Sequence, residues 1–263
     1  MQLKIIYSKR EDNIMSSDKI FNPTLTKKER ENLFEENKKK FLIKNNLKEA
    51  KIIIPVQKTI YEKQDETFNY KDGSYEILTK ENIKEYFKGE KLFHTDFLIM
   101  DENIKNVFVC DKVADCPMLI LVAIKKEVQT LAIAHCGGEY INRFLPKQMM
   151  KALIKEGNVS PSKIKAYITP CISKKSYKYD KYPPFVTNKS AWKNSITKEK
   201  DNYYIDLREA IKNQLIEEGI KKENINISPL DTKENQDFYS HCAYKNGDIT
   251  KKGRFLAGAI FID

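Results

Sequence analysis

The 263-residue chain is poor in the residues from which several common functional sites are built. It has five cysteines, three histidines and one tryptophan, and only five of its 47 basic residues are arginine. No two cysteines form a C-x-x-C pair, which excludes a zinc ribbon and a thioredoxin motif. The odd number and irregular spacing of the cysteines favour reduced thiols, so we expect a cytoplasmic protein.

Long hydrophobic runs are also missing. The longest, residues 118–124, is far too short to cross a bilayer, and residues 1–10 lack the features of a signal peptide. We therefore expect no membrane association. The net charge of +10 invites a nucleic-acid partner. The scarcity of arginine, which base readout and phosphate forks favour, makes such a partner unlikely.

What the chain does contain is enough apolar material for a core, with 41% hydrophobic and 11% aromatic residues. Thr26 and Thr79 have the pattern of helix caps, Asp206 is a third candidate cap, and residues 144–157 and 206–219 have the pattern of helices. A turn is expected at Asp72–Gly73. Strands are expected at residues 3–7, 50–57, 96–100, 106–110, 118–124, 129–135 and 253–262.

The strands at 96–135 are apolar on both faces, which predicts a sheet covered by other layers. Their order predicts an α/β fold, a single-domain layered sandwich over residues 1–263 with mixed, largely antiparallel sheets covered by helices. The least structured part is expected at about 173–202, a Tyr- and Lys-rich loop. A loop of this length in a compact domain is often functional.

Cys116 and His135 are the most informative pair in the sequence. The short linker at 125–128 predicts an antiparallel hairpin, and such a hairpin brings residues 118 and 135 together at one edge of the sheet. The two side chains could simply pack, could ligate zinc, or could form a nucleophile and its base. Asp115 directly precedes the cysteine, and Gly137 and Gly138 after the histidine allow close approach to a ligand.

The chain resembles the laccase-domain family, which is also described as multicopper polyphenol oxidoreductase or purine nucleoside phosphorylase. "ADCPMLIL" (114–121) and "HCGG" (135–138) are similar to its "ADC-x-P" and "HAGWRG" blocks. Weaker similarities run through nearly the whole chain. They include "PVQKT" (55–59), "TDFLIM" (95–100), "TPCISKKSY" (169–177), "FYSH" (238–241) and "GR" (253–254).

The resemblance implies an α/β sandwich and an enzyme acting on a small molecule, by phosphorolysis of purine nucleosides or deamination of adenosine. It also implies a site with zinc held by two histidines and a cysteine, of which Cys116 and His135 match two. With Asp115, these are the expected catalytic residues. The expected substrate-binding residues are Gln57, Gly137, Gly138, Ser240 and Arg254.

Several family positions carry other residues here. Thr59 stands where the family has its first histidine ligand, so we consider His94, His241, Cys136 and Asp111 as the third ligand. Glu139 and Tyr140 replace part of a Trp-Arg-Gly motif, Cys242 and Ala243 replace paired arginines, and Asp231 replaces a late cysteine. A carboxylate near the site would repel phosphate.

These substitutions leave two alternatives open. The fold resembles that of a deamidating bacterial toxin domain with a Cys/His pair, so the chain could be a metal-independent hydrolase or deamidase. There, backbone N–H groups near Gly137 and Gly138 could form an oxyanion hole. Alternatively, it could be a catalytically degenerate relative that binds a ligand.

Overall fold

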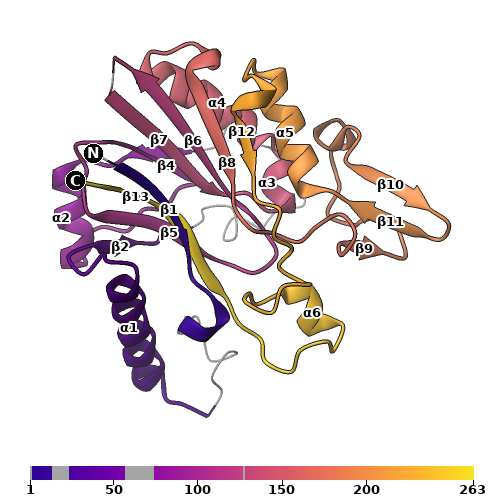
Figure 1. Cartoon of the computed structure of the whole chain (residues 1–263), viewed down its shortest axis with the longest axis horizontal. Helices are drawn as coiled ribbons and strands as arrows, with labels where there is room; N and C mark the ends of the chain where they lie inside the picture. Colours follow the sequence, from indigo (N-terminus) through magenta and orange to yellow (C-terminus); the bar gives the residue numbers. More distant parts are fainter. Residues whose placement is uncertain (1, 14–23, 57–73, 127) are drawn as a thin grey trace.

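The computed structural model describes residues 2–13, 24–56, 74–126 and 128–263. Two β-sheets lie face to face between helices (Figure 1). The smaller sheet has the order β1-β13-β5-β2, formed by Gln2–Tyr7, Phe255–Ile262, Val107–Val113 and Lys51–Ile53. The larger has the order β12-β8-β6-β7-β4-β3, formed by Ile225–Ile227, Ile164–Ile168, Met118–Lys125, Val128–His135, Phe97–Asp101 and Tyr75–Ile77.

The strand pairs are mixed and mostly antiparallel, as the sequence predicts. Only β2 with β5, β3 with β4, and β12 with β8 run parallel. A buried cluster fills the space between the sheets, and its members come from both, among them Val109, Ile120, Ile133 and Phe255. This double burial explains why the strands of the two sheets are apolar over most of their length.

Helices cover the outer faces of both sheets. α1 (Lys27–Lys44) packs Phe41 and Leu42 on the smaller sheet, and α4 (Leu145–Gly157) and α5 (Leu207–Glu217) cover the larger one. The predicted caps are confirmed, because Thr26, Thr79 and Asp206 each accept a backbone hydrogen bond in the first turn of α1, α2 (Lys80–Lys88) and α5. The layers are therefore helix, sheet, sheet and helix.

The hairpin that carries the Cys/His pair is confirmed with its register. Met118 on β6 lies opposite His135 on β7, and the Cys136 N–H donates to the Pro117 carbonyl one step beyond, at 2.8 Å. Cys116 therefore lies opposite the Gly137 end of the hairpin. Two short helices follow near this edge, α3 (Gly138–Asn142) and α6 (His241–Lys245).

In the region predicted as a loop, 173–202, most residues lie outside helices and strands, but the sequence did not predict the short strands found there. A three-stranded sheet occupies this region, with the order β10-β11-β9 formed by Ile196–Glu199, Asn202–Ile205 and Lys178–Tyr179. These strands are too short for an alternating pattern to be recognised. Tyr179 of β9 and the preceding Tyr177 pack against Phe185, which in turn packs against Trp192.

Other predicted boundaries shift. The strand expected at 50–57 is only Lys51–Ile53 and ends before Pro55, which cannot donate to a ladder. β12, α3 and α6 are shorter than a periodic pattern needs, and the sequence did not predict them. The turn predicted at Asp72–Gly73 lies outside the described residues.

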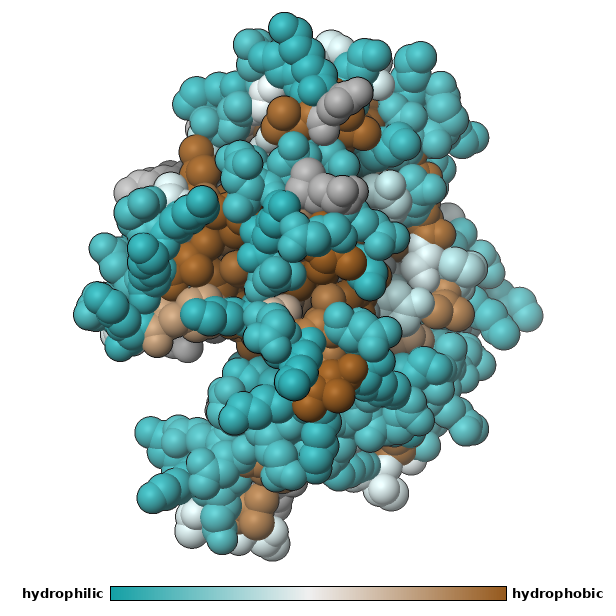
Figure 2. All heavy atoms as spheres, turned by 60° about the vertical axis from the view of Figure 1, so that its left-hand side comes forward, coloured by the Kyte–Doolittle hydropathy of each residue, from teal (hydrophilic) through white to brown (hydrophobic). Residues whose placement is uncertain are grey.

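On the face that Figure 2 shows, most of the surface is hydrophilic and the apolar patches are separate. Within the described ranges, no helix combines the length and the apolar character needed to cross a bilayer.

Candidate active site

Cys116 and His135 come together at the end of the β6–β7 hairpin. A Cβ atom added to Gly137 would lie 2.9 Å from the Cys116 Sγ and 3.7 Å from the His135 Nε2. The sulfur and the ring nitrogen therefore both border one small volume. Cys116 is half-buried, whereas Cys110, Cys136 and Cys171 are fully buried. Cys116 is thus the accessible thiol next to a histidine.

Asp111 holds the other nitrogen of the same imidazole. It lies on β5 in the smaller sheet, and its Oδ2 lies 2.9 Å from the His135 Nδ1. The two side chains are 10% and 19% exposed, so water screens their interaction only weakly. Contacts between side chains thus connect Asp111 on the smaller sheet to His135 and Cys116 at the end of the β6–β7 hairpin of the larger sheet.

This surrounding sets the protonation of the histidine. Burial alone lowers the pKa of His135, but the hydrogen bonds and negative charges of Asp111 and Cys116 outweigh it and raise the pKa to about 10. The imidazole is therefore cationic at neutral pH. Its Nδ1–H donates to Asp111, and its Nε2–H is directed to Cys116 or to a bound molecule.

Gly137 and Gly138 are needed for close packing at this site. A side chain at Gly137 would collide with the Cys116 sulfur, and one at Gly138 would collide with the ring of Phe185, 2.8 Å from the added Cβ. Phe185 stacks on Tyr177, with ring centroids 6.0 Å apart. The region predicted as a loop therefore contributes two aromatic rings beside α3.

Asp115 lies beside the pair but makes other contacts. Its carboxylate accepts hydrogen bonds from the Thr232 hydroxyl and from the Cys242 backbone N–H, both at 2.7 Å. Its φ of +81° is in the left-handed region, which is uncommon for a residue other than glycine. These bonds fix the turn before Cys116 and tie it to α6.

The remaining predicted residues lie outside the Cys116–His135 pair. Ser240 is the N-cap of α6, where its hydroxyl accepts from the Ala243 N–H at 3.0 Å, and His241 begins that helix. Arg254 lies just before β13. His94 is exposed and forms an isolated bridge with Val56, just before β4. Gln57 and Thr59 lie outside the described residues.

The possible metal ligands are Cys116 and His135. Cys136 is buried in the cluster on the opposite face of the larger sheet, and Asp111 is engaged with the histidine ring. Among the residues that the structure describes, no group of three His, Cys, Asp or Glu side chains could hold a metal ion. The described residues thus supply two ligands and do not make up the three-ligand zinc site that the resemblance implies.

Sequence reasoning considered Asp111 only as a metal ligand and missed its contact with the histidine. A carboxylate that follows the apolar run 107–110 was the available signal, because a buried charge requires a partner. Which partner it has depends on how the two sheets pack. Tyr177 and Phe185 were missed because their region was expected to be a loop.

The chain is similar to known proteins along most of its length. It matches the family described as multi-copper polyphenol oxidoreductase laccase over residues 19–262. It is 29% identical over 182 residues to the purine nucleoside phosphorylase YlmD of Bacillus subtilis (strain 168), covering 65% of this chain and 62% of that protein. The aligned part is thus less than two thirds of that relative.

Two solved structures share the fold. YlmD from Geobacillus stearothermophilus has a TM-score of 0.69 at 18% identity, over 88% of this chain and 81% of that one. The hypothetical protein YfiH of Bacillus licheniformis has a TM-score of 0.65 at 21% identity, over 89% and 82%. Since the family profile covers nearly all of the sequence, the chain belongs to the multi-copper polyphenol oxidoreductase laccase family.

Proposed function

We propose that the protein is a purine nucleoside-processing enzyme that acts on adenosine- or inosine-type nucleosides by phosphorolysis or deamination. The proposal rests on one observation, the contacts that link the side chains of Asp111, His135 and Cys116 at the end of the β6–β7 hairpin. Membership of the family and similarity to a relative named purine nucleoside phosphorylase support this substrate class.

Both reactions need a proton donor that faces the substrate. In phosphorolysis a phosphate oxygen attacks C1′, the bond from C1′ to the base breaks, and the leaving purine must gain a proton. In deamination water adds at C6 and the departing amine takes up a proton. The raised pKa of His135 keeps its ring protonated at neutral pH, and Asp111 holds the ring by Nδ1, which leaves Nε2–H on the side of Cys116 and Gly137.

Turnover assays test this proposal. The purified protein is incubated with adenosine and with inosine, each with and without phosphate and with and without added zinc, and the products are separated by chromatography. Free base with sugar 1-phosphate identifies phosphorolysis, and inosine from adenosine identifies deamination. We expect turnover to be lost in Cys116→Ala and retained in Cys136→Ala, which removes a neighbouring sulfur on the opposite face of the sheet.

Absence of turnover under all these conditions, or equal turnover in the two variants, would refute the proposal.

We place the protein in the cytoplasm, because all five cysteines are free thiols.

A metal-independent Cys/His hydrolase or deamidase is the second candidate. It is favoured because the described residues complete a Cys–His–Asp chain but not a three-ligand metal set. A carboxylate that orients an imidazolium next to a cysteine is an arrangement that activates a cysteine nucleophile. The Cys116 sulfur would attack an amide carbonyl carbon, and the first N–H groups of α3 near Gly137 and Gly138 would receive the oxyanion. The C–N bond would then break, the amine would leave with a proton from His135, and water would hydrolyse the resulting thioester.

Alkylation with iodoacetamide, followed by peptide mass spectrometry, tests the second candidate. Cys242 is the internal control because it is also half-buried and is not part of the Asp111–His135–Cys116 arrangement. We expect Cys116 to react at least tenfold faster than Cys242, and the difference to shrink in His135→Ala. Equal rates at the two thiols would contradict it.

A further inference from the structure

β1 differs from the other strands at the edges of the two large sheets. Among the described strands it pairs with β13 alone, and it has six residues, whereas the edge strands β2, β3 and β12 have three residues each. A short edge strand offers few groups to another chain, but a long one without proline is a template on which a further strand can pair. β1 contains no proline, so its open edge is a candidate interaction surface.

The ladder with β13 fixes which backbone groups of β1 point outward. The Ser8 N–H donates to the Leu256 carbonyl at 2.8 Å, one step beyond the end of β1. Because bonded pairs alternate along an antiparallel ladder, the even-numbered residues of β1 bond β13 and the odd-numbered ones direct their N–H and C=O groups away from it. The outward set consists of Leu3, Ile5 and Tyr7. An added strand would pair with these groups.

The larger sheet extends past this open edge. It has six strands and the smaller sheet has four, and β1, β8 and β12 line a common groove. Tyr167 on β8 is only partly buried against the core between the sheets, and Lys165 and Asn226 on the same face are exposed. The larger sheet therefore continues where the smaller sheet has no further strand to cover it.

The groove between the two sheets has a volume of about 690 Å³. The side chains of Leu3, Ile5 and Tyr7 form one wall, and residues of β6, β8 and β12 form the opposite side. The β1 side chains also pack against the core between the sheets, so the apolar part of the groove continues that core. The described residues that line the groove include Lys165 and no carboxylate, which gives the groove a positive charge.

We propose that this groove binds an extended segment of a partner protein, which adds a strand to the smaller sheet beside β1. The backbone of the segment pairs with the N–H and C=O groups of Leu3, Ile5 and Tyr7, and every second side chain of the segment enters the groove. The segment has apolar side chains at these positions and an acidic side chain that meets Lys165. A strand of five or six residues is about 17–20 Å long, which matches the six residues of β1.

A second copy of the chain does not fit this edge. Pairing of β1 with the β1 strand of another copy is symmetric, so β8 and β12 of both copies would project over the same junction. Each projecting part would occupy the space that the other needs. A single extended segment has no second sheet and meets no such obstacle.

Amide hydrogen exchange followed by NMR tests the backbone pairing. The probe is a synthetic peptide in which valine alternates with glutamate and threonine, and two N-methylated versions each block one alternate set of its N–H groups. With the unmodified peptide, exchange at Leu3, Ile5 and Tyr7 should slow about tenfold while Lys4 and Ile6 stay unchanged, because only the first three gain a partner. One N-methylated peptide should bind like the parent and the other should not, since only one set of N–H groups faces β1.

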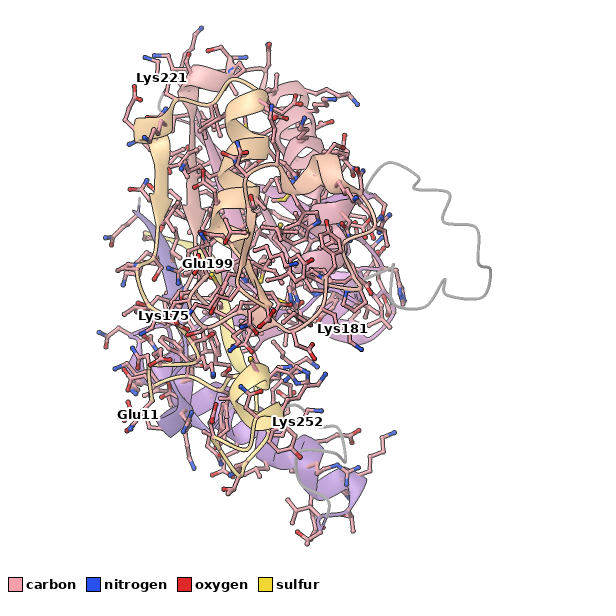
Figure 3. All side chains as sticks on the ribbon, turned by 90° about the vertical axis from the view of Figure 1, so that its right-hand side faces the viewer. Glu11, Lys175, Lys181, Glu199, Lys221 and Lys252 are labelled. Atoms are coloured by element: carbon pink, nitrogen blue, oxygen red, sulfur yellow. The ribbon has the colours of Figure 1, made fainter. Side chains whose placement is uncertain are left out.

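Charge reversal tests the side-chain contact. Lys165→Glu should weaken binding of the glutamate peptide about tenfold and strengthen binding of the same peptide with lysine in place of glutamate. Lys181→Glu is the matched control, because Lys181 is also exposed and lies on the side of the molecule away from β1 and β12 (Figure 3). Thermal melting of both variants checks that each remains folded.

The proposal is overturned if millimolar peptide leaves exchange at Leu3, Ile5 and Tyr7 unchanged, or if both N-methylated peptides bind equally well. An equal effect of Lys181→Glu and Lys165→Glu would also overturn it, because the attraction would then come from net charge alone. Analytical ultracentrifugation tests the other occupant. A dimer whose formation protects the same three amides would assign the edge to a second copy and would likewise overturn the proposal.

Discussion

Replacing Asp111 by Asn tests the chain of residues on which the proposed chemistry depends. The substitution keeps the size of the side chain but removes its charge. An amide can still accept from the His135 Nδ1–H through its oxygen, or it can donate to Nδ1 and impose the other tautomer. The present contact is 2.9 Å long between two groups that are 10% and 19% exposed. A hydrogen bond between charged partners of this kind contributes about 1.5–3 kcal/mol.

This energy sets the expected magnitudes. Dividing this energy by about 1.4 kcal/mol per pKa unit gives the expected shift in Asp111→Asn. The pKa of His135 should fall by roughly one to two units from its present value of about 10. If the full interaction is present in the transition state, the same energy lowers kcat by about 10- to 100-fold. NMR titration of the three histidines measures the first effect, and nucleoside turnover or Cys116 alkylation measures the second.

Asp101→Asn is the control, because Asp101 lies at the far end of β4 and bonds the Asn103 N–H instead. An unchanged pKa of His135 in Asp111→Asn would refute the reasoning, since it would show that the carboxylate does not set the protonation of the ring. A fall of equal size in Asp101→Asn would mean that the change comes from overall charge.

Three further predictions follow from the geometry. Gly137→Ala should keep the fold but displace the Cys116 sulfur, which lies 2.9 Å from the new methyl group, and iodoacetamide labelling should change at Cys116 and stay the same at Cys242. The stabilisation that Asp111 gives through His135 should be complete below pH 6.5 and lost as the pH rises through about 10, because the pKa of His135 is higher in the folded state than in the unfolded state. The free energies of unfolding of wild type and Asp111→Asn in urea melts should therefore converge at high pH. A difference that stays constant with pH would contradict this. Gly258→Ala should destabilise the protein by about 3 kcal/mol or more in urea melts, because the added Cβ would collide with the Val109 carbonyl oxygen in the neighbouring strand, whereas Ala259→Gly should cost about 1–2 kcal/mol.

Local features of the fold could be predicted well. The caps at Thr26, Thr79 and Asp206 are local, since each involves a side chain and a backbone N–H three residues away. The short strands in the region 173–202 were not predicted because they have two to four residues and no apolar alternation. Their formation depends on pairing with each other and on contact of Tyr177 and Tyr179 with Phe185, which are tertiary interactions.

For the candidate site, the sequence by itself determined that Cys116 and His135 meet. A short connection fixes the hairpin register, and the register places the two residues at the same end. Only the tertiary structure decided what surrounds them. Asp111 reaches His135 because two sheets pack face to face, and His241 approaches the turn before Cys116 because its helix is bound to Asp115 across 127 residues of chain. Contacts between separate layers depend on how the whole core packs, so no spacing within one strand pair reveals them.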